Sequence, residues 1–67
     1  DMEDNFQRIA VYWNAHLGLI DFIKTEDVAA MMALLKIARI HSNPTHMDNW
    51  VDACGYMACG GEVVSKP

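Results

Sequence analysis

Two cationic side chains near the middle of the chain have the spacing of a phosphate-binding pair. Lys36 and Arg39 are three residues apart, so both lie on one face if this segment is an α-helix. An arginine guanidinium can bind a phosphate through two parallel hydrogen bonds, whereas a lysine ammonium acts as a point charge. Alternatively, both cations only complement the carboxyl end of a helix dipole. The sequence leaves both interpretations open.

Two aspartates form a second candidate group. Asp48 and Asp52 are four residues apart, which places both carboxylates on one side of a helix. Carboxylates one turn apart can hold Mg²⁺ through water. The alternative is that Asp48 caps the helix and Asp52 is solvated. Asp27, at the start of an earlier helix, can join them if the helices pack antiparallel.

Two further polar residues, Asn5 and Tyr56, lie beside apolar stripes and can line a pocket. Mixed charged and polar side chains among apolar helices are what a small polar pocket requires. The chain has no P-loop, no dinucleotide-binding glycine motif and no Gly-x-Ser-x-Gly turn. The residues that we expect at a ligand site are Lys36, Arg39, Asp27, Asp48, Asp52, Asn5 and Tyr56.

The sulfur and imidazole side chains do not predict a metal centre. Cys54 and Cys59 are five residues apart, a spacing that points two side chains of a helix in different directions, so neither a disulfide nor a zinc site is expected. The histidines also lack a recognised zinc spacing. We interpret the two cysteines as reduced thiols in the core. The methionines in the middle of the chain are likewise expected to fill the core.

Three amphipathic segments must position these residues, at about 4–17, 26–40 and 46–59, in one domain covering 1–67. The first has one apolar stripe and is followed by Gly18, a natural helix end. Thr25 is expected to cap the second helix and Thr45 the third, in a capping-box arrangement with Asp48. The third helix should end near 60–61, with a tail at 62–67, and the alternative is that it runs on through Val64. Its expected inner stripe consists of Met47, Trp50, Val51, Cys54, Met57 and Ala58.

The second helix is apolar around nearly its whole circumference, which predicts that it is buried on most sides. Ala29, Ala33 and Lys36 share one narrow face, where the small side chains would let another helix approach closely. Hydrophobic residues make up 52% of only 67 residues, and a monomer of this size cannot hide that much apolar surface. We therefore expect an all-α three-helix domain completed into a helical bundle by oligomerisation, with a dimer as the first expectation.

Charge and hydropathy exclude several classes of protein. The formal net charge is −4 with five basic residues, too few to follow a phosphate backbone, so binding to duplex DNA is not expected. No uninterrupted apolar stretch is long enough to span a membrane. No signal peptide opens the sequence. The first residue is Asp1, so residues that precede it in a longer protein are an open question.

The sequence resembles a family of small uncharacterised proteins from tailed bacteriophages and prophages. The residues that carry the resemblance run from about 5 to 62. They are Asn-Phe-x-x-Ile-Ala at 5–10, Asp-Val-Ala at 27–29 with Leu-Lys-Ile-Ala-Arg at 35–39, and Asp-x-Trp-Val-Asp-x-x-Gly-Tyr at 48–56. The resemblance implies a viral origin, a location in the host cytoplasm and a further N-terminal segment in other members. It implies no reaction.

A more distant likeness is to the all-α nucleotide pyrophosphohydrolases of the MazG type, which bind Mg²⁺ through acidic pairs on two helices. This chain departs from that pattern, because its second helix offers Lys36 and Arg39 in place of an acidic pair. The likeness is therefore compatible with nucleotide binding and puts metal-dependent hydrolysis in doubt.

Three functional hypotheses follow from these patterns. The leading one is a phage accessory protein that binds a nucleotide or nucleotide-derived signal in an interhelical or intersubunit pocket. The second is a protein that inhibits a host or defence enzyme by docking on it, through an acidic surface and exposed apolar faces. The third is a Mg²⁺-dependent pyrophosphohydrolase. A structural component of the virion remains a further alternative.

Overall fold

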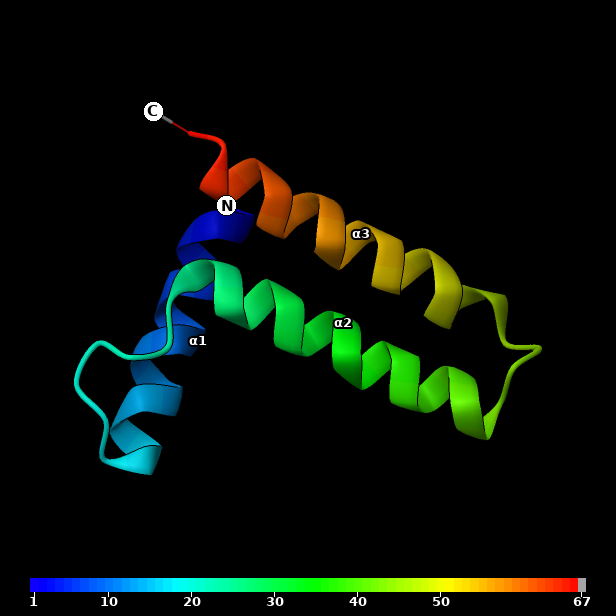
Figure 1. Cartoon of the computed structure of the whole chain (residues 1–67), viewed down its shortest axis with the longest axis horizontal. Coiled ribbons are helices and arrows are strands. Elements are labelled where there is room, and N and C mark those ends of the chain that lie inside the picture. Colours follow the sequence, from blue (N-terminus) through cyan, green and yellow to red (C-terminus); the bar gives the residue numbers. More distant parts are fainter. Residues whose placement is uncertain (67) are drawn as a thin grey trace.

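The computed structural model describes residues 1–66 and confirms the predicted all-α architecture (Figure 1). The helices are α1 (Met2–Leu17), α2 (Thr25–Ser42) and α3 (Met47–Val64). α2 and α3 run antiparallel as a long hairpin, and α1 crosses one end of that hairpin. No strand occurs within the described residues. α2 packs mainly against α3 and less extensively against α1, so the hairpin is the main body of the domain.

Helix α1 ends where its sequence predicts and begins two residues earlier than predicted, at Met2. The Asp4 backbone N–H donates to the Asp1 carboxylate at 2.8 Å, which satisfies one of the free amides of the first turn. Gly18 ends the helix with φ 69°, a left-handed conformation that glycine adopts without steric cost. Between these ends, Phe6 and Ala10 are buried against the hairpin, one turn apart on the same face.

A buried asparagine holds the connection between α1 and α2. The Asn14 carboxamide accepts hydrogen bonds from the backbone N–H groups of Ile23 at 2.9 Å and Phe22 at 3.2 Å, and it donates to the Ile23 carbonyl at 3.0 Å. These groups have no helix or sheet to satisfy them, and buried backbone groups need a partner. Asn14 therefore provides the hydrogen bonds that a helix or sheet would otherwise provide. By fixing the backbone of Ile23, it also holds the buried Ile23 side chain in the core.

Helix α2 starts one residue away from its predicted cap. Lys24 is the N-cap and Thr25 is already helical, so the prediction that Thr25 caps this helix is wrong. The Asp27 carboxylate accepts a hydrogen bond from the Lys24 backbone N–H at 2.9 Å. Asp27 thus provides the side chain that stabilises this helix start, where a negative charge also complements the dipole.

The close approach predicted for the small-residue face of α2 is made by α3. Val28, Ala29 and Ala33 are almost completely buried. A Cβ atom built on Gly60 of α3 would lie 3.1 Å from the Ala29 Cβ atom, so the two helices meet closely at Gly60 and a side chain there would press on Ala29. Gly60 lies inside α3, which continues to Val64.

The prediction for the inner face of α3 is wrong. Met47, Trp50, Val51 and Met57 are exposed large hydrophobic residues, and Cys54 is exposed as well. The helix instead turns small and polar residues toward α2, because only these fit against the alanines of α2. The residues on this inner side, buried or half-buried, are Asn49, Asp52, Ala53, Tyr56, Cys59, Gly60 and Val63.

Two smaller expectations about this region also need correction. Thr45 does not cap α3, because His46 is the N-cap and the Thr45 hydroxyl lies 3.4 Å from the Asn43 side-chain oxygen. The methionines do not all fill the core, since Met31 is exposed together with Met47 and Met57. Both cysteines are free thiols.

The core is small and sits where the three helices meet. It consists of Phe6, Ala10, Ile23, Val28 and Ala29, with partly buried side chains around it. The Phe6 and Tyr56 rings approach with centroids 6.0 Å apart, within the range of favourable aromatic pairs. The rest of the hairpin extends beyond α1 (Figure 1). Within residues 1–66, none of the helices has the length and apolar character needed to cross a membrane.

The two ends of the described chain lie near one another (Figure 1). The Lys66 ammonium lies 2.6 Å from the Glu3 carboxylate. This hydrogen bond raises the pKa of Lys66 above its ordinary value. Both groups are solvated, so the pair fastens the chain ends with little effect on the free energy of unfolding.

Candidate functional site

One predicted cation and one predicted carboxylate meet between α2 and α3. The Lys36 Nζ atom lies 3.1 Å from Asp52 Oδ2. Only 17% of the Lys36 side chain is exposed, whereas Asp52 is 45% exposed. Lys36 lies on the same face of α2 as Ala29 and Ala33, and this face packs on α3, so its stem crosses the helix interface and its ammonium reaches the rim. The pair leaves little net charge at this point of the hairpin.

A shallow hollow lies next to this ion pair, where α2 ends and α3 begins. Its volume is about 660 Å³, within the roughly 300–1,000 Å³ typical of small-molecule sites. One wall is apolar, and the others carry a guanidinium, an imidazole and two carboxamides. The lining residues are Leu35, Ala38, Arg39, Ser42, Asn43, His46 and Asn49. A hollow of this composition offers an anion-binding group beside hydrogen-bonding groups and an apolar surface.

Asn49 is the least ordinary member of this hollow. It is a polar residue only 5% exposed, and its carboxamide makes no hydrogen bond with any other group in residues 1–66. None of the fully shielded side-chain nitrogen or oxygen atoms in that range lacks a partner, so the Asn49 amide atoms retain some contact with the open hollow. A buried carboxamide stabilises the folded protein only when it is hydrogen-bonded. Asn49 therefore presents a free donor and acceptor to whatever occupies the hollow.

Arg39 provides the positive charge available to the hollow, and His46 adds an imidazole that can hydrogen-bond. Arg39 lies in the last turn of α2, and His46 is the N-cap of α3. Arg39 forms no ion pair within residues 1–66, so its guanidinium is free to bind an anion. The adjoining first turn of α3 also has unbonded amides, where the helix dipole favours negative charge.

The other predicted site residues are only partly brought together. Asp48 is exposed in the first turn of α3, next to Asn49. Tyr56 belongs to the core, against Phe6. Asp27 caps the opposite end of α2, and at 1.5 Å per residue it lies about 18 Å along the helix from Arg39. Asn5 is exposed on α1. The structure thus groups Lys36 and Asp52 beside Arg39 and does not add Asp27 to them.

The residues that could hold a metal ion are few. No group of three or more histidine, cysteine, aspartate or glutamate side chains is arranged for metal binding in the described part of the chain. Asp48 and Asp52 share a helix side, but Asp52 is already paired with the Lys36 ammonium. A cation at these carboxylates would have to compete with Lys36, which makes an anion the better match for this end of the hairpin.

Arg39 is the one residue that both lines the hollow and belongs to the predicted site residues, and the most notable omissions are Asn49 and His46. Asn49 lies outside the predicted inner stripe of its helix, because that stripe was placed along the large apolar residues. A signal was nevertheless present, since Asn49, Ala53, Tyr56 and Gly60 repeat at helical spacing. A stripe of small and polar residues at that spacing matches the small-residue face of α2.

Comparison with known proteins places the chain among phage proteins. A family model described as "Domain of unknown function (DUF6378)" matches residues 1–64. The Gene 55 protein of Mycobacterium phage L5 is 48% identical over 56 residues, which cover 84% of this chain and 35% of that protein. The Gene 55 protein of Mycobacterium phage D29 is 34% identical over 64 residues, which cover 96% of this chain and 41% of that protein.

The chain therefore spans between a third and about two fifths of the length of these relatives. No solved structure matches it. The prediction of a small phage protein family is confirmed, whereas the likeness to MazG-type hydrolases stays a prediction.

Proposed function

This chain belongs to the DUF6378 family of phage proteins, and we propose that its α2–α3 hairpin binds a nucleotide or another phosphorylated small molecule in the hollow beside Asn49. The observation that carries this proposal is the buried Asn49 carboxamide, which faces the hollow without a partner. A largely buried carboxamide that bonds no protein group, and that still reaches an open hollow, is available to hydrogen-bond a ligand there. Such groups fix the orientation of ligands in small-molecule sites.

The chemistry of the lining supports a nucleotide-like ligand. The Arg39 guanidinium can take a phosphate in two parallel hydrogen bonds. The Asn49 carboxamide offers both a donor and an acceptor to a base edge or a sugar hydroxyl. Leu35 and Ala38 supply the apolar surface on which a base can lie. Near the rim the charge of Lys36 is balanced by Asp52, so the Arg39 guanidinium is the principal phosphate-binding group.

Thermal unfolding in the presence of nucleotides tests this proposal. The panel contains nucleoside mono-, di- and triphosphates, each with and without Mg²⁺. A ligand at one hundred times its Kd stabilises the folded state by about 2.7 kcal/mol, which raises the Tm of a domain this size by at least roughly 10 °C. Arg39→Gln is expected to abolish most of that rise for the ligand that binds.

Arg8→Gln is the matched control, because Arg8 is an exposed arginine on α1 and its loss changes the net charge equally. Asn49→Ala should weaken binding without lowering the stability of the ligand-free protein, since the carboxamide has no partner to lose. The proposal is overturned if no member of the panel raises the Tm, or if Arg8→Gln weakens the effect as much as Arg39→Gln.

Inhibition of a host or defence enzyme is the second candidate function, and a different feature favours it. In the connection between α1 and α2, Ile20 is 94% exposed and Phe22 is 73% exposed. Asn14 holds this connection in place through hydrogen bonds, so the exposed side chains of Ile20 and Phe22 project from a fixed backbone. Rigid apolar anchors are what a protein-docking loop provides.

Quantitative co-purification from host lysate tests this second candidate, with the wild type compared against the Ile20→Ser/Phe22→Ser double variant. A specific partner should be recovered with the wild type and reduced at least about tenfold with the variant, as expected for the loss of a buried anchor worth more than 1 kcal/mol. Equal recovery of every protein by both forms would contradict docking through this loop. A pyrophosphohydrolase has weaker support, because Asp52 is bound to Lys36.

A further inference from the structure

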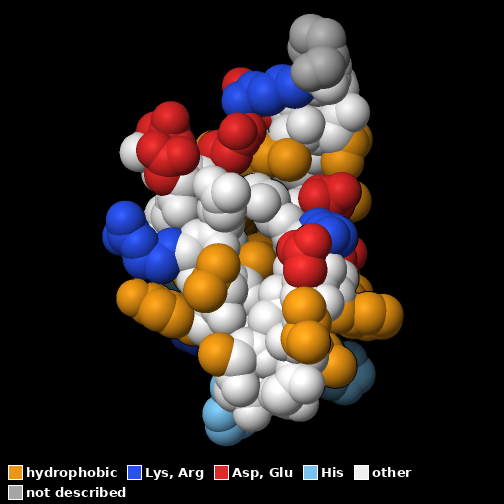
Figure 2. All heavy atoms as spheres, turned by 90° about the vertical axis from the view of Figure 1, so that its left-hand side faces the viewer, with side chains coloured by type: hydrophobic (Ala, Val, Ile, Leu, Met, Phe, Trp, Pro, Cys, Tyr) orange, Lys and Arg blue, Asp and Glu red, His pale blue; other side chains and the backbone are white. Residues whose placement is uncertain are grey.

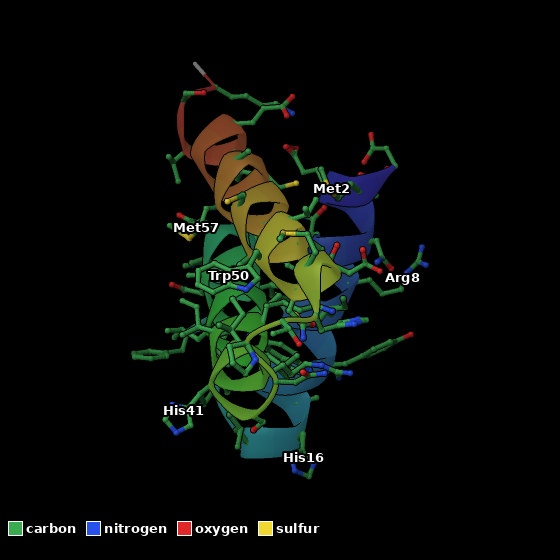
Figure 3. All side chains as sticks on the ribbon, turned by 90° about the vertical axis from the view of Figure 1, so that its right-hand side faces the viewer. Met2, Arg8, His16, His41, Trp50 and Met57 are labelled. Carbon is green, nitrogen blue, oxygen red and sulfur yellow. The ribbon has the colours of Figure 1, made fainter. Side chains whose placement is uncertain are left out.

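The side of the hairpin opposite α1 is apolar and uncovered. We call it the open face, and it is formed by Ala30, Leu34 and Ile37 of α2 and Trp50, Met57 and Val64 of α3. All six residues are exposed, and Leu34 and Met57 are 63% and 60% exposed. Figure 3 shows Met57 on the side of the hairpin away from Arg8 of α1.

Helix periodicity confirms that these residues share one side. On α2, Val28 and Met32 pack on the core, and Leu34 and Ile37 point to the opposite side of the helix at 100° per residue. On α3, Cys59 packs on the core, and Met57 points away from it. The two helices are antiparallel neighbours (Figure 1), so their outward sides lie next to each other.

The open face has the pattern of a helix–helix seam. Trp50, Met57 and Val64 are spaced by seven residues, and so are Ala30 and Ile37, with Leu34 between them. Seven-residue spacing of apolar side chains is typical of helices that pack along their length. None of the six residues is charged, although 21% of the chain is. Figure 2, which views the end where α1 packs, shows acidic and basic groups among the apolar ones instead.

The size of the open face reaches the lower limit of what a specific dimer needs. Two 18-residue helices, each about 27 Å long and about 10 Å wide, form a surface of roughly 500 Å². Two such faces together bury about 1,000 Å², which is about the least area expected of a specific interface. The buried core is too small to offset so much uncovered apolar surface in a chain of 67 residues.

We propose that the open face binds the open face of a second copy of this chain, so that two hairpins form a four-helix bundle. An uncharged apolar face requires a partner surface with the same character, and the same face on a second copy meets that requirement through a two-fold axis. The seven-residue spacing suits the shallow crossing of about 20° in such bundles. Ala30 provides a position where the helices can approach closely.

This association is independent of the proposed ligand site. The hollow is lined by Arg39 and Leu35, which lie on the α1 side of α2. Leu34 and Ile37 lie on the other side of that helix. The dimer therefore leaves the hollow beside Asn49 accessible in both copies. A failure of nucleotide binding would not change the expected oligomeric state, and a monomeric chain could still bind a nucleotide.

Sedimentation equilibrium of the full 67-residue chain tests the proposal. The chain mass is 7.5 kDa, and the wild type is expected to sediment with twice that mass at a concentration of about 100 µM, well above a micromolar Kd. Leu34→Glu should raise the dimer Kd at least about 100-fold, because it places a charge in an apolar interface. Met57→Glu tests the α3 half of the face in the same way.

Val11→Glu is the matched control. Val11 is 59% exposed on α1, so this variant adds the same charge at a similar exposure outside the open face, and its Kd should change by less than about threefold. Circular dichroism checks that all variants keep their helices. A wild type that sediments as 7.5 kDa overturns the proposal and means that the face is covered by another part of a longer protein or by another partner. Equal dissociation by Val11→Glu overturns it too.

Discussion

Replacing Gly60 with leucine is expected to lower the free energy of unfolding by about 1–3 kcal/mol, the usual cost of overfilling a packed interface. The Gly60 position lies against the Ala29 side chain, where even a Cβ atom would be 3.1 Å from the Ala29 Cβ atom. A leucine must therefore push α2 and α3 apart. The measurement is urea unfolding at one fixed protein concentration, followed by circular dichroism.

Gly61→Leu is the control for this prediction, because a side chain at Gly61 meets nothing within 4 Å. Replacing a helical glycine with leucine there should raise the free energy of unfolding by roughly 0.5–1 kcal/mol through helix propensity. The two adjacent substitutions thus have opposite expected signs. If Gly60→Leu stabilises as much as Gly61→Leu, the close approach of α2 and α3 at Gly60 is contradicted.

A double-mutant cycle with Ala29→Gly makes this test specific to the contact. Removing the Ala29 methyl group should reduce the cost of Gly60→Leu, since the leucine then gains part of the missing space. The coupling energy between neighbours of this kind is about 0.5–3 kcal/mol. A coupling near zero would place the damage at Gly60 somewhere other than the contact with Ala29.

The second large effect is expected at Asn14. Asn14→Ala removes three hydrogen bonds to the connection between α1 and α2 and leaves the buried N–H and carbonyl of Ile23 unpaired. At about 1–3 kcal/mol for each of the two unpaired groups, the free energy of unfolding should fall by about 2–6 kcal/mol. For a domain of this size that corresponds to a Tm lowered by at least about 8 °C.

Asn5→Ala is the matched control, because Asn5 is an exposed asparagine in the same helix. Its replacement should change the free energy of unfolding by no more than about 0.5 kcal/mol. Hydrogen exchange adds a local measurement, since the Ile23 amide should exchange faster in Asn14→Ala even where the hairpin remains protected. Equal Tm values for the two variants would contradict the role given to Asn14.

The two proposals use opposite sides of one hairpin. The side that faces α1 carries the ion pair between Lys36 and Asp52 and the hollow with Arg39 and Asn49. The other side is apolar and available for a second copy. This division explains why α2 is apolar around most of its circumference: one side packs on α3, one on α1, and a third contributes to the open face.

Local signals in the sequence determined the number and type of the elements and several of their ends. The stripe containing Phe6 and Ala10 predicted the buried face of α1, and Gly18 predicted its end. The small residues Ala29 and Ala33 predicted where a second helix would approach. These features depend on side chains within one or two turns of each other, so the sequence contains them directly.

Only the tertiary structure decided which side of α3 faces inward. Periodicity shows that a helix has an apolar face, but a partner helix selects the face that fits it. Here the narrow alanine face of α2 admits Gly60 and Asn49, and the bulky side chains of Trp50 and Met57 are left outside. The usual expectation that the largest apolar residues are buried therefore gave the opposite orientation.

In the candidate site, too, some features follow from local sequence and others only from the tertiary structure. The spacing of Lys36 and Arg39 was sufficient to predict two cations on one side of a helix, because that relation is local. The pairing of Lys36 with Asp52, the distance of Asp27 from both, and the free carboxamide of Asn49 depend on the antiparallel alignment of α2 and α3. That alignment depends on packing at Gly60, about a third of the chain away from Lys36, and no local pattern in the sequence specifies it.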